Sequence, residues 1–247
     1  MDRRKFLSTA ALAPFAGYFL QSCGNSIMRS RYKFAIATYS YWHFREPKVT
    51  VQEVIDHAAN LGAHGVDVLH VQMDNETPEY LKSLRQRAEN NGVELICLSI
   101  HQDFVDPDEA VRDRNIEHTL RCIDIAYELG ISYIRLNSGR WNTIKSFDEL
   151  MAKRGIEPVL PGFTEDDGFN WCIDSIMECL PAAEKASVVL ALENHWGLTR
   201  TPEGLLRIVN GIGSPWLGVL MDTGNFLEDP YDKLEQIAAQ AVFVQAK

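Results

Sequence analysis

From residue 32 onward, short apolar runs alternate with longer amphipathic segments along almost the whole chain. The apolar runs are rich in β-branched residues and end abruptly at polar side chains, which is typical of buried parallel strands. This pattern predicts strands at 34–40, 66–71, 93–100, 131–136, 188–192, 217–221 and 241–247.

The segments between these runs repeat apolar residues at helical spacing. Thr50 and Glu53 form a capping box before the first helix, whose apolar face is Val51, Val54, Ile55, Ala58 and Leu61. Further helices are predicted at 78–91, 110–129, 169–186, 202–209 and 230–239. The periodicity fails between 142 and 168, where we expect a long loop with a turn at 166–168. That loop is either a lid or specificity loop over a site, or surface decoration.

Strands and helices that alternate at this spacing predict an α/β fold, a TIM (β/α)8-type barrel. Seven strands are present, so we expect the last βα unit to be missing and the chain to be incomplete at its C-terminus. A doubly wound sheet is the alternative. It is disfavoured because no glycine-rich dinucleotide loop follows the first strand.

The first 23 residues have the pattern of an export signal. Arg3 and Arg4 form a twin-arginine pair before a short apolar run at 10–20, and Cys23 follows in a lipoprotein-type cleavage box. We expect a signal at 1–23, a linker at 24–31 and the barrel domain at 32–247. The mature protein would then be periplasmic or a membrane-anchored lipoprotein, with Cys23 as the lipidated residue. The alternative is plain signal cleavage with an incidental cysteine.

The formal net charge of −10 argues against nucleic acid, because a duplex binder needs a basic face. The cysteines lack the close paired spacing of a zinc site, so buried free thiols are expected. We expect contact with a membrane only through a possible lipid anchor, and an oligomer is possible.

Polar side chains gather where the predicted strands end. They are His70, His101, Asn137, Arg140, Glu193, His195, Asp222, Asn225, Gln245 and Lys247. In a barrel these ends share one rim, where the chemistry takes place. Glu193 and Asp222 carry the strongest signal, because two acids on consecutive strand ends repel each other unless a cation or a shared proton lies between them. A divalent metal resolves the conflict, and oxygen ligands favour Mn²⁺, Mg²⁺ or Co²⁺, with Zn²⁺ as a further option.

The segments ALENH, MDTGN, VQAK and SIHQDF resemble the xylose-isomerase-like TIM-barrel superfamily, the sugar phosphate isomerase/epimerase group. The resemblance implies metal ligands at Glu193, Asp222 and Gln245, where Gln245 stands in place of a frequent histidine. It places a fourth ligand, a glutamate, beyond Lys247. Asn225 likewise replaces a frequent substrate-binding histidine.

The function that fits is a metal-dependent sugar isomerase or epimerase that moves a proton beside a carbonyl through an enediolate, with Glu193 as the base. The substrate is a small carbohydrate. The expected substrate-binding residues are His101, Asn137, Arg140, Trp141, His195, Asn225 and Lys247. The alternatives are a metal-dependent lyase, dehydratase or hydrolase acting on a keto-sugar or cyclic acid, and a non-catalytic carbohydrate-binding lipoprotein.

Overall fold

The computed structural model describes residues 33–42 and 44–247, which belong to one unit, Lys33–Lys247. The predicted twin-arginine signal, the lipidation site at Cys23 and the linker at 24–31 lie outside the described residues. No helix in the described part of the chain is long and apolar enough to cross a membrane.

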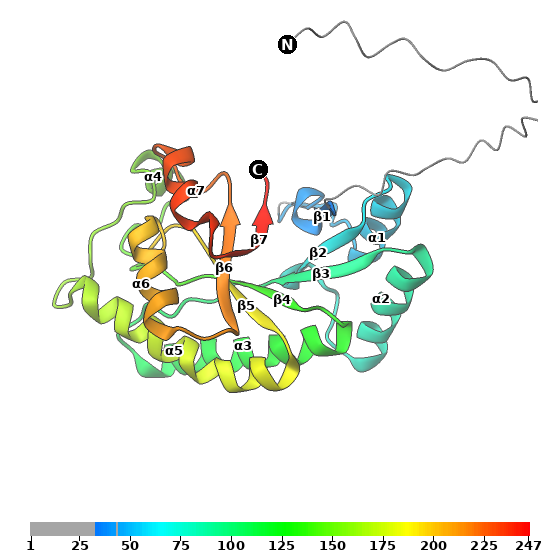
Figure 1. The fold of residues 1–247 in the computed structure, drawn as a ribbon, viewed down its shortest axis with the longest axis horizontal. Coiled ribbons are helices and arrows are strands. Elements are labelled where there is room, and N and C mark those ends of the chain that lie inside the picture. Colours follow the sequence, from blue (N-terminus) through cyan, green and yellow to red (C-terminus); the bar gives the residue numbers. More distant parts are fainter. Residues whose placement is uncertain (1–32, 43) are drawn as a thin grey trace, which may run out of the picture. The chain divides into compact units, whose positions relative to one another are not determined.

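Seven parallel strands form one sheet whose spatial order follows the chain from β1 to β7 (Figure 1). The strands are β1 (Ala35–Ala37), β2 (Gly65–Leu69), β3 (Glu94–Ser99), β4 (Tyr133–Leu136), β5 (Val189–Glu193), β6 (Leu217–Asp222) and β7 (Ala241–Gln245). A doubly wound sheet reverses its order at a switch point. The sequential order therefore excludes that alternative and confirms the α/β TIM-type fold. Within the described residues, β1 pairs only with β2, and β7 pairs only with β6.

Helices follow the strands and cover the sheet, with α3 and α5 packed side by side (Figure 1). They are α1 (Val51–Asn60), α2 (Pro78–Asn91), α3 (Glu109–Leu129), α4 (Phe147–Ala152), α5 (Glu165–Ala186), α6 (Pro202–Ile212) and α7 (Pro230–Ala238). Two 3-10 turns, η1 (Thr38–Ser40) and η2 (His70–Gln72), follow β1 and β2. The capping box at Thr50 and Glu53 is confirmed, and Gly92 and Gly130 end α2 and α3 in the left-handed conformation.

Several local predictions were wrong. The first strand ends at Ala37, and Leu61 is 70% exposed because α1 ends one residue before it. The stretch 142–168 contains α4, which Ser146 caps. The expected turn at 166–168 is instead the first turn of α5, because Thr164 and Asp167 form a second capping box.

The register of the sheet brings two acidic strand ends to the same edge. Glu193 of β5 pairs with Leu220 of β6, and Asp222 of β6 pairs with Gln245 of β7. Apolar side chains fill both sides of these strands below that edge. Both carboxylates therefore emerge from a rigid, buried support, which is the placement that catalytic groups need.

Candidate active site at the carboxyl ends of the strands

Glu193 ends β5 with its side chain fully buried. Its Oε2 accepts a hydrogen bond from Asn137 Nδ2 at 2.9 Å and a longer one from Arg135 Nη1 at 3.4 Å. Its Oε1 accepts from Asn225 Nδ2 at 3.0 Å. Donors from three segments thus fix both oxygens, and two residues expected at the site, Asn137 and Asn225, contact this carboxylate directly.

Asp222 ends β6 and is also fully buried. Its Oδ2 lies 2.6 Å from Lys247 Nζ, and its Oδ1 accepts from the backbone N–H of Gly224. Lys247 Nζ also donates to Asn225 Oδ1 at 3.1 Å, which links the Asp222 and Glu193 groups. Burial, and then the charge of Glu193, raise the pKa of Asp222, as expected for a carboxyl group beside another acid.

Asn194 joins the two strand ends through its side chain. Its Nδ2 donates to the carbonyl of Asp222 at 2.9 Å, and its Oδ1 accepts from the backbone N–H of Asp222 at 2.7 Å. One side-chain amide therefore forms hydrogen bonds with both the N–H and the carbonyl of Asp222, and these bonds hold β6 in register with β5. Asn194 is fully buried, and the sequence analysis did not select it.

Two amino-acid cations stand beside the paired carboxylates. Arg135 contacts Glu193, and Lys247 contacts Asp222. Because these side chains supply positive charge, the two adjacent acids do not by themselves require a divalent metal. They differ in exposure, since the Arg135 side chain is only 12% exposed whereas that of Lys247 is 48% exposed.

His101 and His195 are neutral imidazoles around Arg135. Burial, followed by the charge of Arg135, lowers the pKa of His101 to about 4 and that of His195 to about 3. Arg135 Nη2 lies 3.4 Å from His101 Nε2, and Thr199 Oγ1 accepts from the backbone N–H of His195. A neutral imidazole can donate through one nitrogen and accept through the other, which suits sugar hydroxyls.

Gln245 is bonded across the interior of the sheet. Its Nε2 donates to Asp67 Oδ2 at 2.8 Å, and Ser99 Oγ donates to Asp67 Oδ1 at 2.8 Å. Burial raises the pKa of Asp67. The side chain of Gln245 thus reaches from β7 to β2, although its backbone lies beside Asp222.

Arg140 and Trp141 belong to the loop after β4. Arg140 Nη1 donates to Glu157 Oε2 at 2.7 Å and to the Ile144 carbonyl at 3.0 Å, so it holds the loop together. Trp141 is 8% exposed and packs edge-on against Trp171. No hydrogen bond or ion pair within the described residues joins Arg140 or Trp141 to Glu193.

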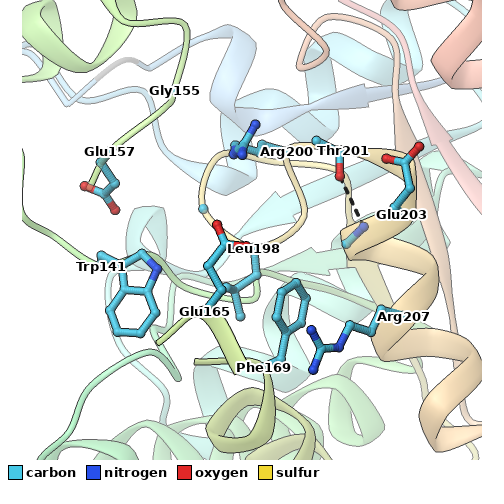
Figure 2. Close-up of a pocket in the computed structure, with 12 residues that line it drawn as sticks. Trp141, Gly155, Glu157, Glu165, Phe169, Leu198, Arg200, Thr201, Glu203 and Arg207 are labelled. Atoms are coloured by element: carbon cyan, nitrogen blue, oxygen red, sulfur yellow. Dashed lines mark hydrogen bonds between the residues drawn. The ribbon is translucent and has the colours of Figure 1, made fainter. Parts of the chain in front are cut away.

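Trp141 lines a cavity of about 220 Å³ that is separate from the two carboxylates. The cavity lies between the 155–157 loop and the starts of α5 and α6, and Figure 2 shows Phe169 and Arg207 at one side of it. The Arg207 guanidinium lies 4.1 Å from the centre of the Phe169 ring. Neither Glu193 nor Asp222 lines this space.

Besides Asn194, the sequence analysis missed Arg135 and Asp67. Both lie inside strands, whereas the predicted site residues are polar side chains at or after the strand ends. Each interrupts a run of apolar residues with a charge, Arg135 in YIRL and Asp67 in VDVL. A lone charge within a buried strand is the signal that identifies them, because charges are almost never fully buried without a partner.

A sequentially ordered parallel sheet with paired acids at the carboxyl edge defines the class of the fold, a TIM-type barrel. The family model for the xylose isomerase-like TIM barrel matches residues 55–247. The chain belongs to this family, which confirms the resemblance inferred from its motifs.

Solved structures with the same fold include two sugar epimerases and a dehydratase. A D-psicose 3-epimerase in the presence of D-fructose has a TM-score of 0.70 and 21% identity, with 87% of this chain and 73% of that chain covered. The 3-keto-D-glucoside 4-epimerase of E. coli has a TM-score of 0.64 and 13% identity, with 83% and 76% covered. A probable 3-DHS dehydratase from Bacillus anthracis has a TM-score of 0.60 and 17% identity, with 86% and 72% covered. A search of curated proteins finds no significant match.

Proposed function

We propose that this protein is a divalent-metal-dependent sugar isomerase or epimerase that transfers a proton next to a carbonyl. The observation that carries the proposal is the pair of fully buried carboxylates, Glu193 and Asp222, on adjacent strand ends of a xylose isomerase-like barrel. The similar epimerase structures support this class of reaction. A carbohydrate substrate outside the cytoplasm is part of the proposal and depends on the export signal at 1–23.

The donor set around Asp222 fits a hard divalent cation. Asp222 and Glu193 supply carboxylate oxygens, and Gln245 lies beside Asp222 in the sheet register, with an amide oxygen to offer. Lys247 Nζ marks where positive charge is favoured, and this half-exposed side chain can swing away to admit an ion. Oxygen donors suit Mn²⁺, Mg²⁺ or Co²⁺, and such an ion would polarise the substrate carbonyl.

Glu193 is the residue that would take and return the carbon-bound proton. Asn137 and Asn225 fix both of its oxygens, so its carboxylate is already oriented before substrate binds. The neutral His101 and His195 would hold sugar hydroxyls. Lys247 would bind a substrate oxygen once it leaves Asp222.

Two measurements test the proposal. Elemental analysis of the purified chain after incubation with Mn²⁺, Co²⁺, Mg²⁺ or Zn²⁺ should find about one equivalent more in wild-type protein than in the variant that carries both Glu193→Ala and Asp222→Ala. In deuterated water, wild-type protein should introduce deuterium beside the carbonyl of a ketose, and Glu193→Gln should lower that rate by at least about a hundredfold. The control is Glu94→Gln, which replaces an exposed carboxylate at the start of β3, the end of the strand away from the site. Unchanged deuterium exchange in Glu193→Gln would refute the role of this base.

A metal-free carbohydrate-binding protein is the second candidate. It is favoured by the contacts of Arg135 and Lys247, which neutralise the two carboxylates without an ion. Calorimetric binding of ketoses in the presence and absence of EDTA separates the two. Affinity that survives chelation, with no deuterium exchange, would select the binding protein. A ketose that loses water when it is incubated with the protein, measured by mass spectrometry of the product, would identify a dehydratase.

A further inference from the structure

A second group of metal-ligand side chains lies between β2 and α3. His70 begins the η2 turn directly after β2, whereas His118 and Cys122 stand four residues apart on one face of α3. One ligand atom from each of these three residues lies within 4.8 Å of the others. We call these three residues the His70 cluster.

His70 is prepared to accept a ligand. It is 8% exposed, and its Nε2 contacts Glu76 Oε1 at 2.8 Å. The proton of that hydrogen bond sits on Nε2, because the carboxylate has none to give. His70 Nδ1 therefore carries a lone pair, yet it is buried without a hydrogen-bond partner. An unpaired buried acceptor is unfavourable, which indicates that a ligand belongs there.

Glu76 is itself held in place by a cation. Arg121 Nε lies 3.1 Å from Glu76 Oε2, the oxygen that does not contact His70. A carboxylate that receives the second ring N–H of a histidine is the usual support behind a metal-bound imidazole. The chain Arg121, Glu76 and His70 thus fixes the His70 ring and leaves its Nδ1 free of hydrogen bonds.

His118 and Cys122 complete the ligand set. Cys122 Sγ lies 3.7 Å from Nε2 and 3.9 Å from Nδ1 of His118, and Arg121 Nη2 donates to His118 Nδ1 at 3.1 Å. His118 is half-buried, and Cys122 is fully buried. Ligand atoms around a tetrahedral zinc ion are about 3.5 Å apart, so the separations of up to 4.8 Å in the cluster must shorten by at most about 1 Å on binding. We expect the half-buried His118 ring to rotate on binding, which gives up its contact with Arg121 Nη2, while Arg121 Nε stays on Glu76.

We propose that His70 Nδ1, a ring nitrogen of His118 and Cys122 Sγ bind one Zn²⁺ ion at a site separate from Glu193 and Asp222. The Zn–S bond replaces the S–H bond of Cys122, whose proton is released to solvent. Two imidazoles and one thiolate form a mixed nitrogen and sulfur set that suits Zn²⁺, and the fourth position is left for water. Burial lowers the pKa of both His70 and His118, so both rings are neutral ligands at pH 7.

Cobalt is the probe that distinguishes this site from the carboxylate site. A Co²⁺ ion bound to thiolate absorbs in the near ultraviolet, whereas Co²⁺ on carboxylates does not. Titration of the purified chain with Co²⁺ should produce this absorption, and Zn²⁺ should abolish it. The absorption should persist in Glu193→Ala with Asp222→Ala, so the result is independent of the proposed enzymatic function.

Variants assign the absorption to the cluster. Cys122→Ser and His118→Gln should each eliminate it, and circular dichroism confirms that each variant is folded. His118→Gln keeps the test decisive if loss of the buried thiol disrupts the core. Cys172→Ser, another fully buried cysteine, and Cys23→Ser should leave it unchanged. Glu76→Gln should weaken Zn²⁺ binding about 10–100-fold. Absence of the absorption in wild-type protein, or its survival in folded Cys122→Ser, would overturn the proposal.

Discussion

Arg135 connects more of the site than any other described cation. From the middle of β4 it donates to Glu193 and to the Ile100 carbonyl, and its charge also bears on Asp67, His101 and His195. Arg135 balances the charge of two buried carboxylates, Glu193 and Asp67. Its removal alone would be costly, because both acids would remain without a cation in a medium of low polarity.

Replacing Arg135 with Gln should therefore lower the free energy of unfolding by about 3–5 kcal/mol, the cost of breaking a buried ion pair from one side. Urea unfolding at pH 7 measures this change. Arg85→Gln removes an exposed pair with Glu89 and should cost less than about 0.5 kcal/mol. Equal losses in the two variants would show that Arg135 has no special role.

His195 should make the protein sensitive to acid. Its pKa is about 3 in the folded protein, because of burial and then Arg135, against an ordinary value of 6.5. The unfolded chain thus binds the proton more readily, so stability is complete above about pH 6.5 and declines as the pH falls toward 3. Partial exposure reduces the effect, and we expect a loss of about 1 kcal/mol from this group between pH 7 and pH 5.

Urea unfolding at the two pH values, in wild type and in His195→Gln, isolates this contribution. The variant should lose about 1 kcal/mol less stability than wild type over the interval. His57→Gln controls for removing an exposed imidazole. A variant that loses as much stability as wild type would contradict the assignment to His195.

At the scale of elements, capping chemistry decides what the sequence reveals. Thr50, Thr77 and Thr201 all cap helices that were predicted from them. The start of α5 was missed because Asp166, Asp167 and Gly168 have the composition of a turn, while Thr164 upstream supplies the cap. Local composition therefore predicted a loop where a side-chain hydrogen bond starts a helix.

Thr164→Ala should destabilise the protein by about 1 kcal/mol, because its Oγ1 accepts from the Asp167 N–H and Asp167 bonds back to its backbone. Thermal unfolding followed by circular dichroism measures this loss. Ser83→Ala, at an exposed position within α2, should have almost no effect. An unchanged midpoint in Thr164→Ala would mean that the start of α5 does not depend on its cap.

For the molecule as a whole, strand periodicity was enough to predict the sheet, because seven apolar runs correspond to seven strands. It also brought Glu193, Asp222, Asn137, Asn225 and Lys247 to one place. It could not predict which partners the side chains choose. Arg140 donates to Glu157 in its own loop, and Gln245 of β7 donates to Asp67 of β2. The spacing of the cysteines could not reveal the His70 cluster either, because two of its three members are histidines.

Protection from hydrogen exchange should follow position in the sheet. The strand β5 is buried and paired on both sides, whereas β7 pairs on one side within the described residues and exposes Val242 and Val244. Amides of β5 should exchange only by global unfolding, and those of β7 through local opening. Mass spectrometry of deuterated peptides measures both strands. Equal protection of β5 and β7 would show that β7 opens only with the whole sheet.

Asn194 acts as a register lock between β5 and β6. A parallel strand that slips by one residue turns every side chain to the other face, and would aim Asp222 at the helices. Hydrogen bonds of the backbone alone can re-form after such a slip, but the two bonds from Asn194 to the Asp222 backbone form only in the native register. A misaligned pairing would leave this amide buried and unbonded. The two hydrogen bonds of Asn194 therefore favour the native alignment of β5 and β6 over a slipped one.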